Sequence, residues 1–481
     1  MRLPRFSALR PQTGELLHLD LLRFIAASGI VLHHSQRFFF RDNQIEAWRQ
    51  ASGLALFVDL FFAISGYIIA HVYANRTATA GQFAGFMQRR IARLAPLHWL
   101  TMAAAMAAWL LFLRFGFLHL GVLKLGAYTE SMPSLSPRCL AETAVLVQAA
   151  IPCGGDAFNG ISWSINAEMA MYVAFPLFAA AGHFRRALPL LLGLAVLAVA
   201  LAAIRFGFGS VSIESWTSYS VHPYLRALPS FLIGVGLWFL REPLKRIPAP
   251  RTLLLFAVPA LLASMVTGQG TPLVLFLTYL AAALAVSADL VGSPHRIVKL
   301  IAPLGQLTYS IYMWHALFIL LALTAINQYL PHASSLEMSI LALLTYAGIV
   351  GWSYLSFTVV ETPARRWLDS LPPFGRRHSA NGGVVAKPRL LEIEGAQIGE
   401  DVPGLFDDLL MAVKPGSSHS SHWAGNRGPW KPESSVLKAS TISATSAATP
   451  PPRGAPSGLG GSTARPITGR RPMPTWPPSR P

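Results

Sequence analysis

Arginine and histidine, which seldom occur inside membrane helices, both lie in one apolar stretch, HLDLLRFIAASGIVLHHS, residues 18–35. An α-helix turns about 100° per residue, so the 11-residue step from Arg23 to His34 leaves their side chains within roughly 20° of each other. They are roughly 16 Å apart along the helix axis, about half the thickness of a bilayer core. His33 points roughly 80° away from this stripe, so the spacing favours His34 as the partner of Arg23.

This stripe has two interpretations. A charge inside a membrane helix costs about 2.5–3.5 kcal/mol on insertion scales, so such residues usually face a protein interior or a wet cavity. On this view Arg23 and His34 line a polar chamber through the membrane. Alternatively, Arg23 extends to the lipid headgroups and the histidines lie at the far interface. The helix alone leaves both interpretations open.

Two carboxylates are expected at a similar depth to His34. Asp59 and Glu168 lie about five and about seven residues inside the outer ends of their predicted spans. A carboxylate beside an imidazole suits general-base catalysis, because it fixes the tautomer and stabilises the imidazolium that forms. We therefore predict that His34 and Glu168 are catalytic and that Asp59 has a supporting place. In the alternative, which we favour for Asp59, either carboxylate pairs with Arg226 and only holds helices together.

Further polar residues are predicted to support this site. Tyr309 and His315 lie in LGQLTYSIYMWHALFI, and an intramembrane histidine is most often bonded to a neighbouring helix. Ser164 lies at the predicted outer interface, where it could face a sugar. Cys139 and Cys153 fall in a long loop outside the cytoplasm, where an oxidising compartment would allow a disulfide. The sequence has no HExxH, CxxC or Walker A motif, so no metal site or bound cofactor is expected.

A second group of cations lies in RRIARLAP. Arg90 and Arg93 are one helical turn apart and face the same way, and Pro96 is predicted to open the following span. Together with Arg23 they would form a cationic cluster at the inner face of the membrane, suited to binding phosphates. The alternative is ordinary anchoring by basic residues on the cytoplasmic side.

The composition of the chain is that of a polytopic membrane protein. It is 53% hydrophobic and only 13% charged, whereas soluble domains have roughly 25% charged residues. The net charge of +17 comes from short loops and a polar tail, so nucleic acid is not an expected partner. We predict an all-α fold with ten spans: Leu17–Ser35, Leu54–Tyr73, Ala95–Phe115, Ile161–Ala181, Ala187–Ile204, Tyr224–Leu240, Thr252–Thr267, Pro272–Val291, Gly305–Ile326 and Met338–Val360. The stretch Cys139–Ile151 is too short to span and is predicted to be a re-entrant or surface helix.

Basic residues mark one side of the membrane. They are concentrated in alternate loops, and this pattern predicts that both termini are cytoplasmic. We predict that residues 1–16 form a short cytoplasmic segment, 17–372 the membrane domain, and 373–481 a disordered cytoplasmic tail rich in Pro, Gly and Ser.

The order of these motifs resembles the acyltransferase-3 family of membrane-bound O-acyltransferases, which modify bacterial surface and exported polysaccharides. Seven segments carry the resemblance, in this order: LDLLRFIAASGIVLHHS, VDLFFAISGYII, FMQRRIARLAPLHW, ISWSINAEMAMYVAFPLF, YLRALPSFLIGVGLW, LGQLTYSIYMWHALFI and VVETPARRW. They extend over nearly all of the chain from His18 to Trp367.

The resemblance implies transfer of an acyl group, by default acetyl, from cytoplasmic acyl-CoA as co-substrate to a hydroxyl of a saccharide or lipid-linked saccharide. It implies a bacterial inner-membrane location. The family's paired functional positions fall on Arg23 and His34, on Arg90 and Arg93, and on Ser164 and Glu168. Whether His34 acts as a base or as an acylated nucleophile stays open. The competing hypotheses are a transporter or flippase of a lipid-linked saccharide, which would leave its substrate chemically unchanged, and a membrane scaffold.

Overall fold

The structure, a computed structural model, describes residues 16–39, 53–115, 136–150, 159–207, 216 and 223–372. All of these belong to the first of two units, Met1–Gly383. The predicted N-terminal segment, apart from Leu16, and the predicted tail lie outside the described residues, so the predicted domain division stays a prediction.

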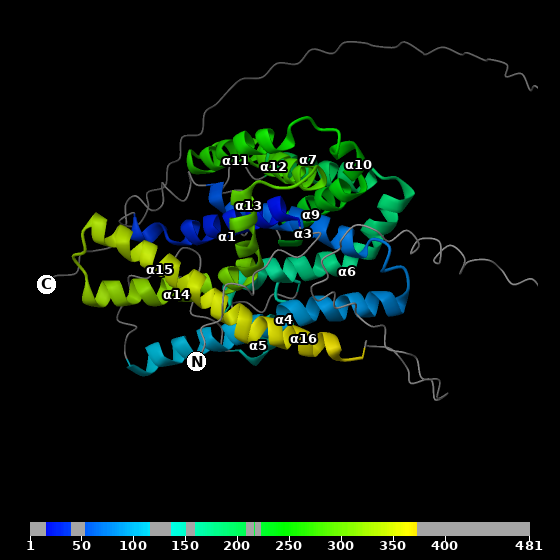
Figure 1. The fold of residues 1–481 in the computed structure, drawn as a ribbon. Helices are drawn as coiled ribbons and strands as arrows, with labels where there is room; N and C mark the ends of the chain where they lie inside the picture. Colours follow the sequence, from blue (N-terminus) through cyan, green and yellow to red (C-terminus); the bar gives the residue numbers. More distant parts are fainter. Residues whose placement is uncertain are drawn as a thin grey trace, which may run out of the picture. The chain divides into compact units, whose positions relative to one another are not determined.

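The described residues form helices and no strands, as predicted (Figure 1). The α-helices are α1 (Leu17–His34), α3 (Phe57–Tyr73), α4 (Ala80–Phe115), α5 (Pro137–Ala144), α6 (Trp163–Phe184), α7 (Leu188–Gly207), α9 (Pro223–Phe239), α10 (Arg241–Leu244), α11 (Pro250–Val266), α12 (Thr271–Leu290), α13 (Arg296–Ile301), α14 (Thr308–Tyr329), α15 (Ser335–Ser356) and α16 (Thr362–Ser370). A π-helical turn, Phe357–Glu361, joins α15 to α16.

Seven helical segments in the described part are long and apolar enough to cross a membrane. They coincide with seven of the ten predicted spans. The other three predicted spans coincide with α1, α9 and α11, which have 18, 17 and 17 residues. The chain is a multi-pass membrane protein, while the count of ten spans and the cytoplasmic termini stay predictions.

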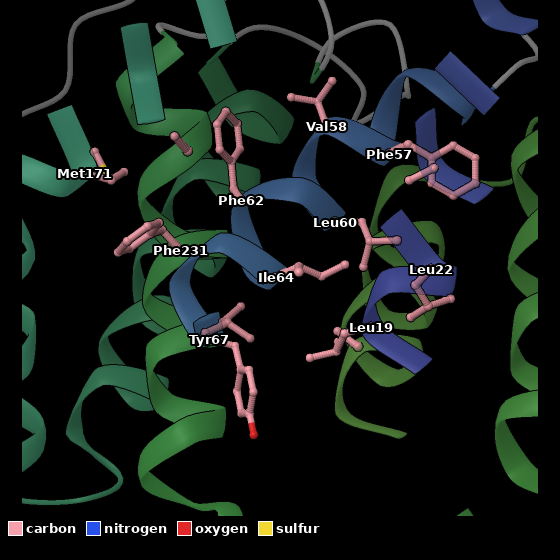
Figure 2. Close-up of a cluster of buried hydrophobic side chains, with 14 of the residues drawn as sticks. Leu19, Leu22, Phe57, Val58, Leu60, Phe62, Ile64, Tyr67, Met171 and Phe231 are labelled. Atoms are coloured by element: carbon pink, nitrogen blue, oxygen red, sulfur yellow. The ribbon is translucent and has the colours of Figure 1, made fainter. Parts of the chain in front are cut away.

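Helix α3 lies at the centre of the main hydrophobic core (Figure 2). Its side chains from Phe57 to Tyr67 pack against Leu19 and Leu22 of α1 and against Phe231 of α9. The backbones of α3 and α9 approach so closely that a Cβ on Gly66 would collide with the carbonyl group of Phe231. Small residues at such crossings are typical of helix packing in membranes. Residues on α3, among them Asp59, are therefore held in a fixed orientation.

The start of α1 is fixed by a residue that the sequence did not single out. The Asp289 carboxylate, on α12, accepts hydrogen bonds from the backbone N–H groups of His18 at 2.8 Å and Leu19 at 3.1 Å. It also lies 2.7 Å from Nδ1 of His18, and both side chains are buried. A carboxylate at a helix N-terminus satisfies free N–H groups and complements the helix dipole. Asp289 thereby anchors the helix that carries Arg23 and His34.

The prediction that Pro96 opens the third span is wrong, because helix α4 begins well before it. Pro96 lies inside a continuous 36-residue helix and does not open a new one. A proline interrupts the hydrogen-bond ladder, but neighbouring helices in membrane proteins can bind the backbone groups that it frees. Tyr309 of α14 donates a hydrogen bond of 2.5 Å to the carbonyl of Leu94, whereas the carbonyl that Pro96 leaves without its helical donor is that of Ala92. Arg90 and Arg93 therefore stand on a regular helix.

The predicted short helix after the third span corresponds to α5. Its last residues are tied to α4, because the carbonyl of Ala144 accepts a hydrogen bond from the indole of Trp99 at 2.8 Å. Cys139, on α5, is buried and disulfide-bonded. Cys153, the other cysteine of the sequence, lies outside the described residues, so their pairing stays a prediction.

Candidate active site

A cavity lies among α1, α3, α4, α6 and α14. The polar side chains that line it include six of the predicted site residues: Arg23, Arg90, Arg93, Ser164, Glu168 and Tyr309. Most of the remaining wall is apolar and comes from α3. The structure thus brings together, from four helices, residues that are up to 286 positions apart in the sequence.

The arginines of this cavity differ in how they are paired. Arg23 forms an ion pair of 3.2 Å with Asp20, one turn earlier on α1. Arg90 donates a hydrogen bond of 3.2 Å to the Tyr73 hydroxyl, and its guanidinium carbon lies 5.1 Å from the centre of that ring. Arg93 makes no hydrogen bond or ion pair with any residue that the structure describes. The carboxylates of Asp20 and Glu361 lie near enough to act on Arg93 through charge, but neither contacts it directly. A partly buried guanidinium without a direct contact favours an anionic ligand.

Glu168 is held by two hydroxyl groups. Ser65 of α3 donates a short hydrogen bond to Oε1, and Tyr172, one turn later on α6, donates another of 2.5 Å to the same atom. The sequence interpretation did not single out Ser65 or Tyr172. The four-residue step from Glu168 to Tyr172 could have indicated the second, because residues at that spacing share one helix face.

Tyr312 closes another part of the cavity wall. Its hydroxyl lies 2.7 Å from Oγ of Ser164 and donates a hydrogen bond of 3.2 Å to the carbonyl of Ile161. Its ring contacts Phe61 and, on α14 itself, His315, at centroid distances of 6.3 and 5.6 Å. Tyr312 therefore links the cavity to the histidines beside it.

Two of the predicted histidines lie next to each other. The rings of His34 and His315 are 5.1 Å apart between centroids, with an interplanar angle of 38°. His34 is not among the residues that line the cavity, and Tyr312 connects the cavity to this pair. The described residues show no hydrogen bond between His34 and Glu168, whose carboxylate is held by Ser65 and Tyr172. The catalytic roles of His34 and Glu168 stay predictions.

Asp59 occupies a separate, fully paired site. Its carboxylate accepts hydrogen bonds from Nε and NH2 of Arg226 at 3.1 and 2.7 Å, and from the indole of Trp216 at 3.0 Å. The Asp59 side chain is fully buried and that of Arg226 nearly so. The guanidinium also lies 5.3 Å above the ring of Trp163. This is the helix-joining ion pair that the sequence offered as the alternative for Asp59, and it connects α3 to α9.

Apolar helices long enough to cross a bilayer, arranged around a buried cavity with arginines and a carboxylate, define a multi-pass membrane protein with a polar site inside its helix bundle. A family model described as an acyltransferase domain, Acyl_transf_3, matches residues 16–358. The chain belongs to this acyltransferase family, which confirms the resemblance found in its motifs.

Two curated relatives share parts of this sequence. "Protein 2 in picA locus" of Rhizobium radiobacter is 43% identical over 89 residues, which are 18% of this chain and 41% of that protein. "Acyltransferase MdmB" of Streptomyces mycarofaciens is 29% identical over 176 residues, 35% of this chain and 40% of that protein. The chain thus spans about two fifths of the length of each. No solved structure matches it.

Proposed function

We propose that this protein is a membrane O-acyltransferase of the bacterial inner membrane, which transfers an acyl group from acyl-CoA to a hydroxyl of a cell-surface or exported saccharide. The observation that supports this most strongly is the cavity that gathers Arg23, Arg90 and Arg93 beside Glu168, next to a pair of histidines. Acetyl is the acyl group by family likeness, and one of the two relatives is itself named an acyltransferase.

The arginines suit the donor. CoA carries phosphate groups, and a guanidinium binds phosphate through two parallel, charge-assisted hydrogen bonds. Arg93, which has no hydrogen-bond or ion-pair partner among the described residues, is the cation best placed to take one. The thin pantetheine arm then carries the thioester along the apolar wall formed by α3 towards the histidines.

His34 suits the proton transfer. As the acceptor oxygen attacks the thioester carbonyl, its proton passes to the imidazole, a C–O bond forms and the C–S bond breaks. The departing thiolate recovers that proton from the imidazolium and leaves as CoA thiol. In the second route the imidazole itself attacks the carbonyl, the C–S bond breaks, and CoA leaves as the thiol with the proton of the ring. The acyl-histidine then transfers the group to the hydroxyl, whose proton returns to the imidazole. Both routes need His34.

The proposal is tested by transfer of labelled acetyl from acetyl-CoA to saccharide in membranes that contain the protein. Label should appear with the intact protein and with His332→Ala, which removes an exposed histidine, but not with His34→Ala at equal expression. Unchanged transfer by His34→Ala would overturn the role of this residue. Movement of saccharide across the membrane without use of acetyl-CoA would favour the transporter hypothesis instead.

A further inference from the structure

His315 is a buried histidine in which one ring nitrogen makes a hydrogen bond and the other makes none with the described residues. Nδ1 lies 2.6 Å from the backbone carbonyl of Tyr312, and the side chain is fully buried. A carbonyl only accepts hydrogen bonds, so Nδ1 must carry the ring hydrogen. In the neutral ring Nε2 is then a bare acceptor. It is buried and has no hydrogen-bond partner among the described residues.

A buried acceptor without a partner is unusual in a folded protein and needs an explanation. The ring that faces His315 from α1 is that of His34, at a centroid distance of 5.1 Å. Neutral imidazole has one N–H donor and one bare nitrogen. An N–H of His34 is therefore the complementary group for Nε2 of His315. Glu168, the residue expected from depth to orient His34, accepts hydrogen bonds from Ser65 and Tyr172 at Oε1, and the described residues show none between it and His34.

We propose that His315 is the positioning residue of His34: its Nε2 accepts the N–H of one His34 ring nitrogen and so leaves the other bare to take the proton of the acceptor hydroxyl. The inference rests on the proposed function. Catalytic hydrogen bonds are often long in a ligand-free enzyme and shorten when the substrates bind, and the centroid distance is consistent with such a closure.

The proton path follows from this arrangement. The hydroxyl proton moves to the bare nitrogen of His34 as the C–O bond forms and the thioester C–S bond breaks. The resulting imidazolium is stabilised by the acceptor Nε2 of His315, whose own hydrogen stays on Nδ1 and is fixed by the Tyr312 carbonyl. The same proton then leaves with the CoA thiolate, which returns His34 to its neutral form. Tyr312 thus connects the histidine pair to the cavity by its backbone and by its ring.

Two amide substitutions at one position separate this role from simple packing. His315→Asn places an amide N–H near Nδ1 and keeps the bond to the Tyr312 carbonyl, but leaves nothing at Nε2. His315→Gln extends its amide to the position of Nε2, where its oxygen can accept from His34, and gives up the Nδ1 bond. A merely structural His315 would tolerate asparagine better, whereas a positioning His315 tolerates glutamine better.

The experiment measures kcat, donor KM and unfolding temperature in detergent for the intact protein and both variants. We expect kcat to fall about 100-fold in His315→Asn and about 10-fold in His315→Gln, with donor KM unchanged in both. The inference would be overturned if kcat of His315→Asn equalled or exceeded that of His315→Gln. It would also be overturned if the substitutions changed only donor KM. Absence of acyl transfer by the intact protein would instead overturn the proposed function, so the two failures are distinguishable.

Discussion

The two carboxylates inside the helix bundle, Asp59 and Glu168, have opposite surroundings. Asp59 is fully buried and receives three hydrogen bonds, two of them from the Arg226 guanidinium. Glu168 borders a cavity, and both of its hydrogen bonds come from neutral hydroxyl groups. Arg93 lines the same cavity and makes no hydrogen bond or ion pair with any described residue.

This difference separates charges that join helices from charges that await a ligand. A buried ion pair with complete hydrogen bonding uses all of its interaction capacity within the protein. A half-buried charge that faces a cavity, with only neutral hydroxyl groups or no direct contact beside it, keeps that capacity for something bound there. Substitutions at the first site should therefore change stability, and substitutions at the second should change turnover.

The largest expected effect is on stability at the ion pair. Asp59→Ala leaves the Arg226 guanidinium buried without its counter-charge, which costs about 3–5 kcal/mol of unfolding free energy. Thermal unfolding in detergent, followed by circular dichroism, measures the loss. The matched control is Asp369→Ala, because Asp369 forms a partly exposed ion pair of 3.6 Å with Arg365 and such pairs contribute about 0–1 kcal/mol. Equal effects of the two substitutions would contradict the distinction.

A smaller effect, on turnover, is expected at Glu168. Glu168→Gln keeps the shape and one acceptor oxygen but removes the charge, so the protein should fold normally while kcat falls about 10- to 100-fold. Initial rates of acetyl transfer at saturating donor measure this. Glu242→Gln, at an exposed carboxylate on α10, should leave the rate unchanged. The opposite result, a Glu168→Gln protein with a lowered unfolding temperature and unchanged kcat, would show that Glu168 stabilises the fold, as Asp59 does, and does not serve turnover.

The smallest effect is expected at the cavity wall. Tyr312→Phe removes the hydroxyl that bonds Ser164 and the Ile161 carbonyl, while the backbone carbonyl that binds His315 remains. Each of these two neutral hydrogen bonds contributes about 1 kcal/mol to stability, so the unfolding temperature should fall slightly. Because neither bond touches the reacting atoms, kcat should fall by less than about 10-fold. A loss of turnover as large as that of His34→Ala would show that the Tyr312 hydroxyl has a direct part in the chemistry.

Sequence periodicity and depth predicted much of this arrangement. They placed Arg90 and Arg93 together on α4, where both line the cavity, and they offered the Asp59–Arg226 pair. The matching depth of His34 and Glu168 stays a prediction. Depth along an axis does not fix the rotation of one helix against another, however. Among the described residues, the ring of His34 lies beside that of His315, and Glu168 is bonded to Ser65 and Tyr172.

Other contacts depend on packing alone. Asp289 caps α1 from a helix about 270 residues further along the chain, and Tyr309 binds the carbonyl of Leu94 near the proline of α4. No local pattern marks a residue as the partner of a distant backbone group, so these contacts could not be predicted. The continuous course of α4 through Pro96 has the same cause, because neighbouring helices decide whether a proline ends a membrane helix.

The most direct test of the proposal that Arg93 binds the donor is to measure acetyl-CoA binding by the purified protein with isothermal titration calorimetry. Arg93→Ala is compared with Arg186→Ala, which removes an exposed arginine away from the cavity. We predict that Arg93→Ala weakens binding about 10- to 100-fold without lowering the unfolding temperature. A charge-assisted contact to phosphate is lost, while Arg93 makes no hydrogen bond or ion pair with the residues that the structure describes. Equal affinities of the two variants would contradict the assignment of Arg93 to the donor.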